Sequence, residues 1–115
     1  MTDRLTIEGE GHDPVSGLLH EAGAPTAFLI LAHGAGAPMT HPFMANLAHD
    51  LDAHGVSTLR FNFAYTEAGR RRPDRTSRLL AVLRSALREG LDRAGHLPAF
   101  AGGKSMGGRM TSTLL

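Results

Sequence analysis

Near its C-terminal end the chain carries a glycine-flanked serine, and this feature constrains the fold more than any other. The five residues Gly103-Lys-Ser-Met-Gly107 follow a short apolar stretch, Pro98–Ala101. A G-x-S-x-G sequence between a strand and a helix fits the sharp turn called a nucleophile elbow. In such a turn the serine is backbone-strained, and the two glycines lie so close that a β-carbon on either would clash. The pattern therefore predicts that Ser105 stands above the end of a strand.

The same residues also look like the end of a phosphate-binding P-loop. Gly103-Lys104-Ser105 matches the last three positions of G-x-x-x-x-G-K-[ST], which likewise lies between a strand and a helix. The first glycine of that pattern would fall at position 98, which is a proline. Because a P-loop holds phosphate with free backbone N–H groups and proline has none, this residue argues against nucleotide binding.

The rest of the chain alternates extended and helical patterns. Residues 27–32 are apolar at every position, which is typical of a strand covered on both faces. Strand–helix–strand–helix–strand order predicts right-handed crossovers and a three-layer α/β/α sandwich with a mostly parallel sheet. We find no linker or internal repeat, so residues 1–115 are expected to form a single domain. The expected elements are an N-terminal antiparallel hairpin (5–7 and 15–19), strands at 27–32, 56–61 and 98–101, a polar loop at 62–73, and helices over about 42–54 and 74–94, the second capped by Asp74.

Composition excludes several classes of function. The 12 basic residues are nearly balanced by 11 acidic ones, so the net charge of +1 gives no case for a nucleic-acid or membrane partner. The chain has no cysteine, which excludes disulfides and thiolate metal sites. With no signal-like segment and no membrane-length apolar run, we expect a cytoplasmic protein. The 7 histidines lack metal-ligand spacing, and neither a metal nor another cofactor is predicted.

A second glycine-rich turn, His33-Gly34-Ala35-Gly36, follows the first central strand. Parallel α/β sheets place their ligand sites at the carboxyl ends of strands, so this turn could be half of an oxyanion-binding site. The alternative is a simple glycine turn. A dinucleotide-binding turn is disfavoured, because Met39 stands where the third glycine should be and the next strand ends in Asn62 rather than an acid.

Five arginines gather in the polar loop and at the start of the second helix: Arg70, Arg71, Arg72, Arg75 and Arg78. Such a cluster could bind an anionic substrate or partner, or it could be ordinary solvated surface. The second interpretation is favoured, because charge runs beside a helix are usually exposed.

These features together resemble the α/β-hydrolase superfamily. The quoted residues are His33-Gly-Ala-Gly36, Arg60-Phe-Asn-Phe63, the arginine-rich loop and Gly103-Lys-Ser-Met-Gly107. Within the superfamily they are similar to the dienelactone-hydrolase-like branch that includes testis-expressed protein 30 and KANSL3-type sequences. The resemblance implies that Ser105 is the nucleophile, that the backbone N–H groups of Ala35 and Met106 form the oxyanion hole, and that Gly103 and Gly107 shape the elbow. His33, Gly34 and Gly36 would support the loop.

The chain departs from this family in one respect. The family's triad acid and histidine follow the elbow on later loops, whereas here the sequence runs only ten residues beyond Ser105. We therefore expect the N-terminal part of a longer hydrolase, with little turnover from this chain alone. His33 is the only histidine expected near the strand ends, where it would brace its own loop. The strand bearing Phe100 should be an unpaired edge, prone to self-association.

Two hypotheses for the function follow from these residues. In the first, the protein is a serine hydrolase that acts on a small ester or related acyl substrate through Ser105. In the second, it is a non-catalytic hydrolase-fold scaffold that works through surface contacts, because a fold and an elbow do not guarantee chemistry. The sequence specifies neither the acyl group nor the oligomeric state.

Overall fold

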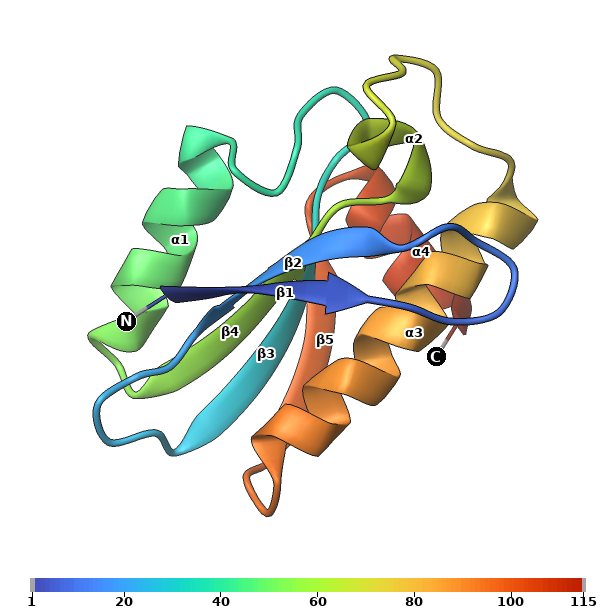
Figure 1. Ribbon diagram of the computed structural model, residues 1–115. Helices are drawn as coiled ribbons and strands as arrows, with labels where there is room; N and C mark the ends of the chain where they lie inside the picture. The colour runs from blue at the N-terminus through green and yellow to red at the C-terminus, as the bar shows by residue number, and fades with distance from the viewer. Residues whose placement is uncertain (1, 115) are drawn as a thin grey trace.

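In the computed structural model, which describes residues 2–114, five strands form one mixed sheet with helices on both sides (Figure 1). The strand order is β1-β2-β4-β3-β5. The predicted layered α/β architecture is confirmed, including the N-terminal antiparallel hairpin. The strands are β1 (Thr2–Ile7), β2 (Val15–His20), β3 (Ala27–Ala32), β4 (Val56–Phe61) and β5 (Ala99–Gly103), and the helices are α1 (Pro42–Asp52), α2 (Ala64–Glu67), α3 (Thr76–Ala94) and α4 (Met106–Leu114).

Strand β3 lies at the centre of the parallel part of the sheet. It pairs in parallel with β4 on one side and with β5 on the other, whereas β2 pairs with β1 and β4 antiparallel. Ala32 at the end of β3 is in register with Phe61 of β4 and Gly103 of β5. The three strands therefore end at the same level, so the segments that follow them meet at one edge of the sheet.

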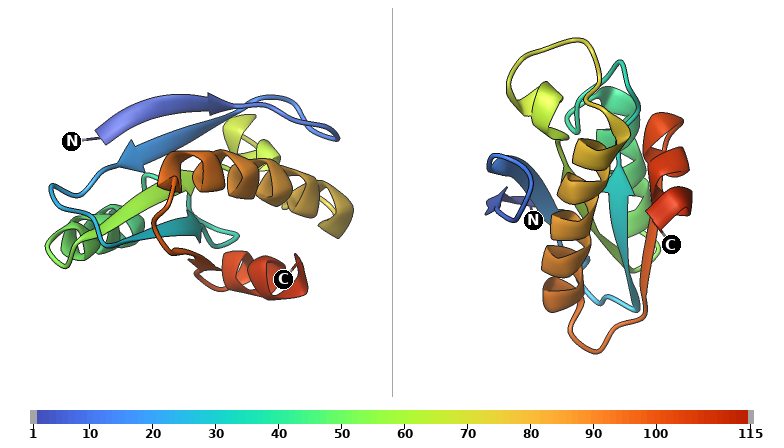
Figure 2. Two further views of the ribbon diagram at one scale, coloured as in Figure 1. Left: turned by 90° about the horizontal axis from the view of Figure 1, so that it is seen from below. Right: turned by 90° about the vertical axis from the view of Figure 1, so that its right-hand side faces the viewer.

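Helix α1 packs against one face of the sheet, and α3 and α4 pack against the other. The main core joins alternate residues of β3, such as Phe28 and Ile30, to α3 residues such as Leu83 and to Met106 of α4. On the opposite face α1 buries Met44 and Ala48. Figure 2 shows the sheet between α1 and α3, with β1 and β2 extending it beyond α3.

The order of the strands opens a crevice at the carboxyl end of β3. From β3 the chain turns through α1 to β4, and from β4 it returns through α3, on the opposite face, to β5. The segment after β3 therefore leaves toward one face while the segments after β4 and β5 leave toward the other. Open α/β sheets bind their ligands at such a switch point.

Two local predictions were wrong. The segment predicted as a polar loop contains the short helix α2, in which Tyr65 is buried. Asp74 does not cap α3, whose N-cap is Arg75 without a side-chain hydrogen bond. Instead, the Asp74 carboxylate accepts the backbone N–H of Tyr65 at 3.0 Å. The physical reason is that α2 also begins with unpaired N–H groups, and its start lies within reach of Asp74.

The strand bearing Phe100 lies at the edge of the sheet, as predicted, and that side chain is 60% exposed. Within residues 2–114, no helix combines the length and the apolar character needed to cross a bilayer. In the same range no three histidine or acidic side chains gather where they could hold a metal ion.

Candidate active site

Ser105 occupies the turn between β5 and α4. Its φ of 55° makes it the one non-glycine residue with positive φ among residues 2–114. The left-handed region costs an L-residue about 1–2 kcal/mol, so the surrounding structure must impose it. Hydrogen bonds do so on both sides: Gly107 N–H donates to Lys104 O at 3.0 Å, and Arg109 N–H donates to Ser105 O at 3.0 Å. The serine side chain is left exposed at the start of α4.

The glycines on either side of Ser105 lie against the end of β3. A β-carbon on Gly103 would sit 2.6 Å from Ala32 O and 2.7 Å from the carbonyl carbon of Gly107. One on Gly107 would sit 2.5 Å from Ala32 O and 2.6 Å from His33 O. These neighbours are all backbone atoms, which cannot rotate away as a flexible side chain can. Only glycine therefore fits at both positions.

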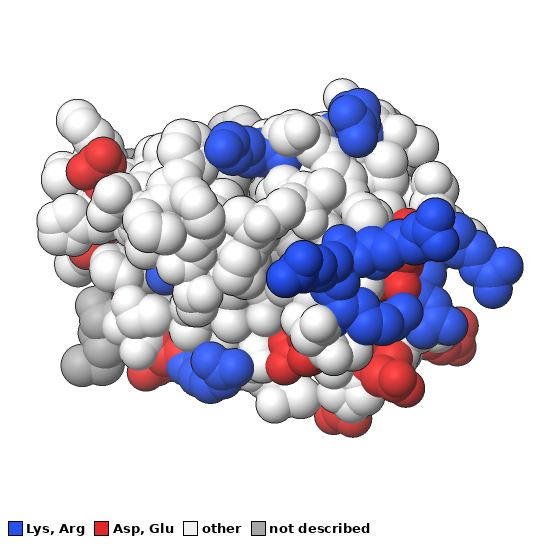
Figure 3. All heavy atoms as spheres, turned by 90° about the horizontal axis from the view of Figure 1, so that it is seen from above, with Lys and Arg blue, Asp and Glu red and all other residues white. Residues whose placement is uncertain are grey.

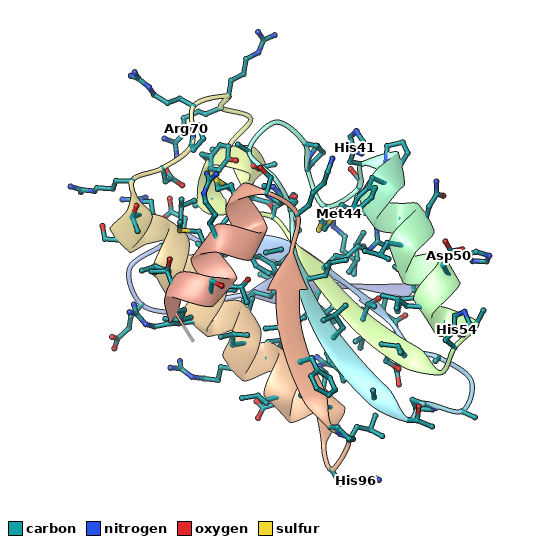
Figure 4. All side chains as sticks on the ribbon, turned by 180° about the vertical axis from the view of Figure 1, so that it is seen from behind. His41, Met44, Asp50, His54, Arg70 and His96 are labelled. Atoms are coloured by element: carbon teal, nitrogen blue, oxygen red, sulfur yellow. The ribbon has the colours of Figure 1, made fainter. Side chains whose placement is uncertain are left out.

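The loop after β3 lies directly beside the elbow. A β-carbon on Gly34 would sit 3.3 Å from Lys104 O and 3.7 Å from the β-carbon of Ser105. Between the loop and α1 runs a groove of about 330 Å³, with Ser105 in its wall (Figure 4 shows this side of the molecule). The groove is lined by Gly34, Ala35, Gly36, Ala37, His41, Phe43, Met44, Lys104 and Ser105.

His33 is fully buried and both of its ring nitrogens are engaged. Nδ1 lies 2.6 Å from Gly34 O and therefore donates to it, while Nε2 accepts the backbone N–H of Phe63 at 3.1 Å. The two bonds together require the neutral ring protonated on Nδ1. Burial lowers the pKa of His33, which favours the same form, although the bond to Gly34 acts in the opposite direction. His33 thus joins the loop to the segment after β4 and has no nitrogen free to serve Ser105.

Three further side chains, from β4, α2 and the segment between them, hold the loop by hydrogen bonds. Arg60 Nη1 donates to Met39 O at 3.0 Å, and Asn62 Oδ1 accepts Met39 N–H at 3.0 Å. The hydroxyl of Tyr65 donates to Ala35 O at 2.9 Å. Sequence reasoning placed Asn62 and Tyr65 in a polar loop and gave Arg60 no individual role. The one available signal was the alternation of residues 60–63, Arg-Phe-Asn-Phe, which continues the strand pattern into the turn.

Sequence reasoning also missed the groove wall opposite Ser105. Lys104 Nζ lies 4.7 Å from the ring centre of Phe43, a cation–π contact across the groove. His41 lines the same groove from the start of α1, where its Nδ1 accepts the N–H of Phe43 at 3.1 Å. The expectation that His33 is the only histidine at this end of the sheet was therefore wrong, because α1, whose N-cap is His41, begins at the groove that holds Ser105.

The residues predicted to bind an oxyanion lie at the same end of the sheet as Ser105. Met106 is the first residue of α4 and its side chain is buried. Ala35 is exposed and lies in the groove wall beside Ser105. The first backbone N–H groups of α4 have no partner inside the helix and form the positive end of its dipole. This edge of the sheet therefore combines a serine hydroxyl with backbone donors.

The arginine cluster lies on the surface near this site, and Figure 3 shows a group of basic side chains at one side of the top face. Arg70, Arg71, Arg72 and Arg75 are exposed. Arg70 forms an ion pair of 3.5 Å with Asp74. A second hollow of about 420 Å³ lies between Arg70 and Arg71 and the far side of the loop 35–38.

Comparison with known proteins assigns the class. A family model described as an alpha/beta hydrolase domain matches residues 25–115, and the chain therefore belongs to the alpha/beta hydrolase family. No curated protein sequence matches the chain. The predicted superfamily is confirmed, while the narrower branch with testis-expressed protein 30 stays a prediction.

Solved structures of the same fold support this placement. An alpha-beta serine hydrolase homologue from Coxiella burnetii is similar with a TM-score of 0.81 and 21% identity over 97% of this chain and 56% of that one. Dienelactone hydrolase from Anabaena variabilis is similar with a TM-score of 0.82 and 20% identity, over 99% of this chain and 56% of that one. A serine hydrolase without a lid from Xanthomonas campestris has a TM-score of 0.82 and 18% identity, over 98% of this chain and 56% of its own. The chain thus spans about half the length of these structures.

Proposed function

We propose that this chain carries the nucleophile of a serine hydrolase that acts on a small ester or related acyl substrate. The observation that carries the proposal is the backbone of Ser105, held at a φ of 55° between two glycines that have no room for a β-carbon. A fold keeps such strain only where the surroundings enforce it, and strain of this kind clusters at active sites. The exposed serine and the adjoining groove supply a place for a substrate.

In the proposed reaction, Ser105 Oγ attacks the carbonyl carbon of the ester. The carbonyl π electrons move to the oxygen, and the backbone N–H groups of Ala35 and Met106 hydrogen-bond the resulting oxyanion. A base takes the proton of Ser105 and gives it to the alcohol, which leaves when the intermediate collapses. Water then attacks the acyl group, which is released as an acid while a proton returns to Ser105. The dipole of α4 also favours negative charge at this point.

The serine needs a base, and we propose that this base and its acid partner lie in a part of the fold that these 115 residues do not span. His33 is unsuitable because both ring nitrogens are already bonded. The solved hydrolases extend well beyond the matched region, which is about 56% of their length. The cytoplasmic location and the small acyl substrate likewise stay predictions.

A fluorophosphonate probe tests the proposed nucleophile. Ser105 Oγ would form a bond to phosphorus, fluoride would leave, and the serine proton would pass to a base or to solvent. We expect a longer protein that contains this chain together with the base to be labelled at Ser105, and Ser105→Ala in that protein to lose the label. Ser112→Ala, an exposed serine on the same helix, should label as wild type does, with peptide mass spectrometry locating the adduct.

Labelling that persists in Ser105→Ala would overturn the proposal. So would the absence of labelling both in this chain and in a longer protein that contains it. In that case the non-catalytic scaffold becomes the better explanation, since the hydrolase fold alone does not specify chemistry.

A further inference from the structure

We propose that Tyr65 is a positioning residue for the oxyanion hole, in that its hydroxyl fixes the orientation of the peptide groups around Ala35. This inference rests on the proposed function, because the peptide plane that Tyr65 holds adjoins the Ala35 amide that would bind the oxyanion. Tyr65 is 1% exposed, and it acts through the backbone of the loop after β3.

Two peptide planes meet at Ala35, and each is held by one buried ring. In a trans peptide the N–H points opposite to the C=O, and the described chain has no cis peptide bond. His33 donates to Gly34 O at 2.6 Å and so fixes the plane that carries the Ala35 N–H. Tyr65 donates to Ala35 O at 2.9 Å and fixes the next plane, which carries the Gly36 N–H.

The glycines beside Ala35 make these two bonds necessary. A β-carbon on Gly36 would meet no atom within 4 Å, so packing does not restrain this residue. Glycine also has wider φ and ψ freedom than any other residue. A loop of this kind would sample several orientations of its N–H groups, most of which point away from Ser105. A donor that is already oriented costs no reorganisation when the oxyanion forms.

Tyr65 is itself held in place by hydrogen bonds and by ring packing. Its backbone N–H donates to Asp74 at 3.0 Å, and its C=O accepts the N–H of Arg70 at 2.9 Å. Its ring packs edge-on against His33 with the ring centres 6.2 Å apart. The hydroxyl also lies 4.0 Å from the sulfur of Met106. The same oxygen therefore contacts both residues whose N–H groups are the proposed oxyanion donors.

The variant Tyr65→Phe tests the hydroxyl alone, because the ring still fills its place in the core. We expect the second-order rate of fluorophosphonate labelling at Ser105 to fall about tenfold, less than the roughly 10²–10³-fold loss typical when a donor is removed outright. The matched control is Ser85→Ala, which deletes another buried hydroxyl that hydrogen-bonds His12 at 2.8 Å far from the loop. This control should change the rate less than about twofold.

Amide order parameters from ¹⁵N relaxation provide a readout independent of chemistry. In Tyr65→Phe the order parameters of Ala35 and Gly36 should drop from about 0.85, typical of rigid backbone, toward about 0.6, while Ser85→Ala leaves them unchanged. A labelling rate within twofold of wild type would overturn the proposal, whatever the melting temperature does. If neither this chain nor a longer protein that contains it is labelled, the proposed function fails separately. Unchanged order parameters in Tyr65→Phe would then overturn the positioning role, and a drop would support it.

Discussion

Two glycine-rich turns stand side by side at the carboxyl ends of neighbouring strands, and they are held in different ways. The turn after β5, at Gly103–Gly107, is fixed by contact between backbone atoms, with no space for a β-carbon at either glycine. The turn after β3, at residues 34–39, is fixed by hydrogen bonds to Arg60 of β4, to Asn62 just beyond that strand and to Tyr65 of α2. Steric contact therefore holds the elbow after β5, whereas hydrogen bonds hold the loop after β3.

The difference indicates how each turn serves the proposed chemistry. The elbow must hold one strained residue in one conformation, and contact between backbone atoms is stiff enough for that. The loop must aim N–H groups at a developing charge, and buried hydrogen bonds set direction as well as distance. It follows that the elbow should respond mainly to changes in volume, and the loop mainly to changes in hydrogen bonding and protonation.

A pair of glycine substitutions should show the largest effect. Gly107→Ala would bring a β-carbon to 2.5 Å from Ala32 O, and we expect the free energy of unfolding to fall by about 3 kcal/mol. Gly36→Ala meets no atom within 4 Å and has no positive φ, so its effect should stay within about 0.5 kcal/mol. Urea denaturation of both variants measures the contrast, and equal losses would break the distinction between the two turns.

A pH titration of stability probes the hydrogen-bonded loop. Burial lowers the pKa of His33, so the unfolded chain binds this proton more readily than the folded one. Stability is therefore fully present above about pH 6.5, the ordinary pKa of histidine, and is lost as the pH falls below it. The slope from this one group can reach about 1.4 kcal/mol per pH unit.

The variant His33→Gln supplies the control, since glutamine carries no proton that titrates in this range. Its stability should be lower than that of wild type at pH 7, but its decline between about pH 6.5 and 5 should be shallower. Chemical denaturation at a series of pH values measures both slopes. Identical slopes would mean that protonation of His33 is not what destabilises the loop in acid.

The strain at the elbow should be measurable as a smaller effect. Ser105 has a φ of 55°, a region that glycine enters without steric cost. We expect Ser105→Gly to be more stable than Ser105→Ala by about 0.5–1 kcal/mol, although neither variant should react with a fluorophosphonate. The comparison uses two variants that both lack the hydroxyl, so it isolates the backbone. A lower stability for the glycine variant would show that the turn stores no strain.

The same contrast explains which parts of the site could be predicted from the sequence. The elbow is encoded by five consecutive residues, and its glycine requirement is a local steric rule, so Gly103 to Gly107 predicts the turn directly. The hydrogen bonds that hold the loop after β3 join residues that are far apart in the sequence. Tyr65 bonds to a residue 30 positions away, and Asn62 to one 23 positions away, and such pairings depend on how β4 lies beside β3.

The fold can be predicted from the sequence more fully than the hydrogen bonds that hold the loop. The apolar run of β3 and the helical period of α3 are long enough to identify each element. Helix α2 has only 4 residues, about one turn, which is too short to leave a periodic pattern. Sequence spacing assigns Asp74 to the nearer helix start, at α3, because it cannot foresee a hydrogen bond to Tyr65 nine positions earlier.

The smallest effect is expected where the hydrogen-bonded network reaches the surface. Arg70 pairs with Asp74 at 3.5 Å, but its side chain is 57% exposed, whereas that of Asp74 is 6% exposed and also accepts the Tyr65 N–H. An exposed ion pair contributes little, so Arg70→Gln should lower the free energy of unfolding by less than about 0.5 kcal/mol. Asp74→Ala should cost about 1 kcal/mol, since it removes the acceptor at the start of α2. Thermal melts of both variants at low and high salt measure the difference. If Arg70→Gln lowers the free energy of unfolding as much as Asp74→Ala does, the exposed arginine is part of the hydrogen-bonded network that fixes the loop. That network would then extend to the surface.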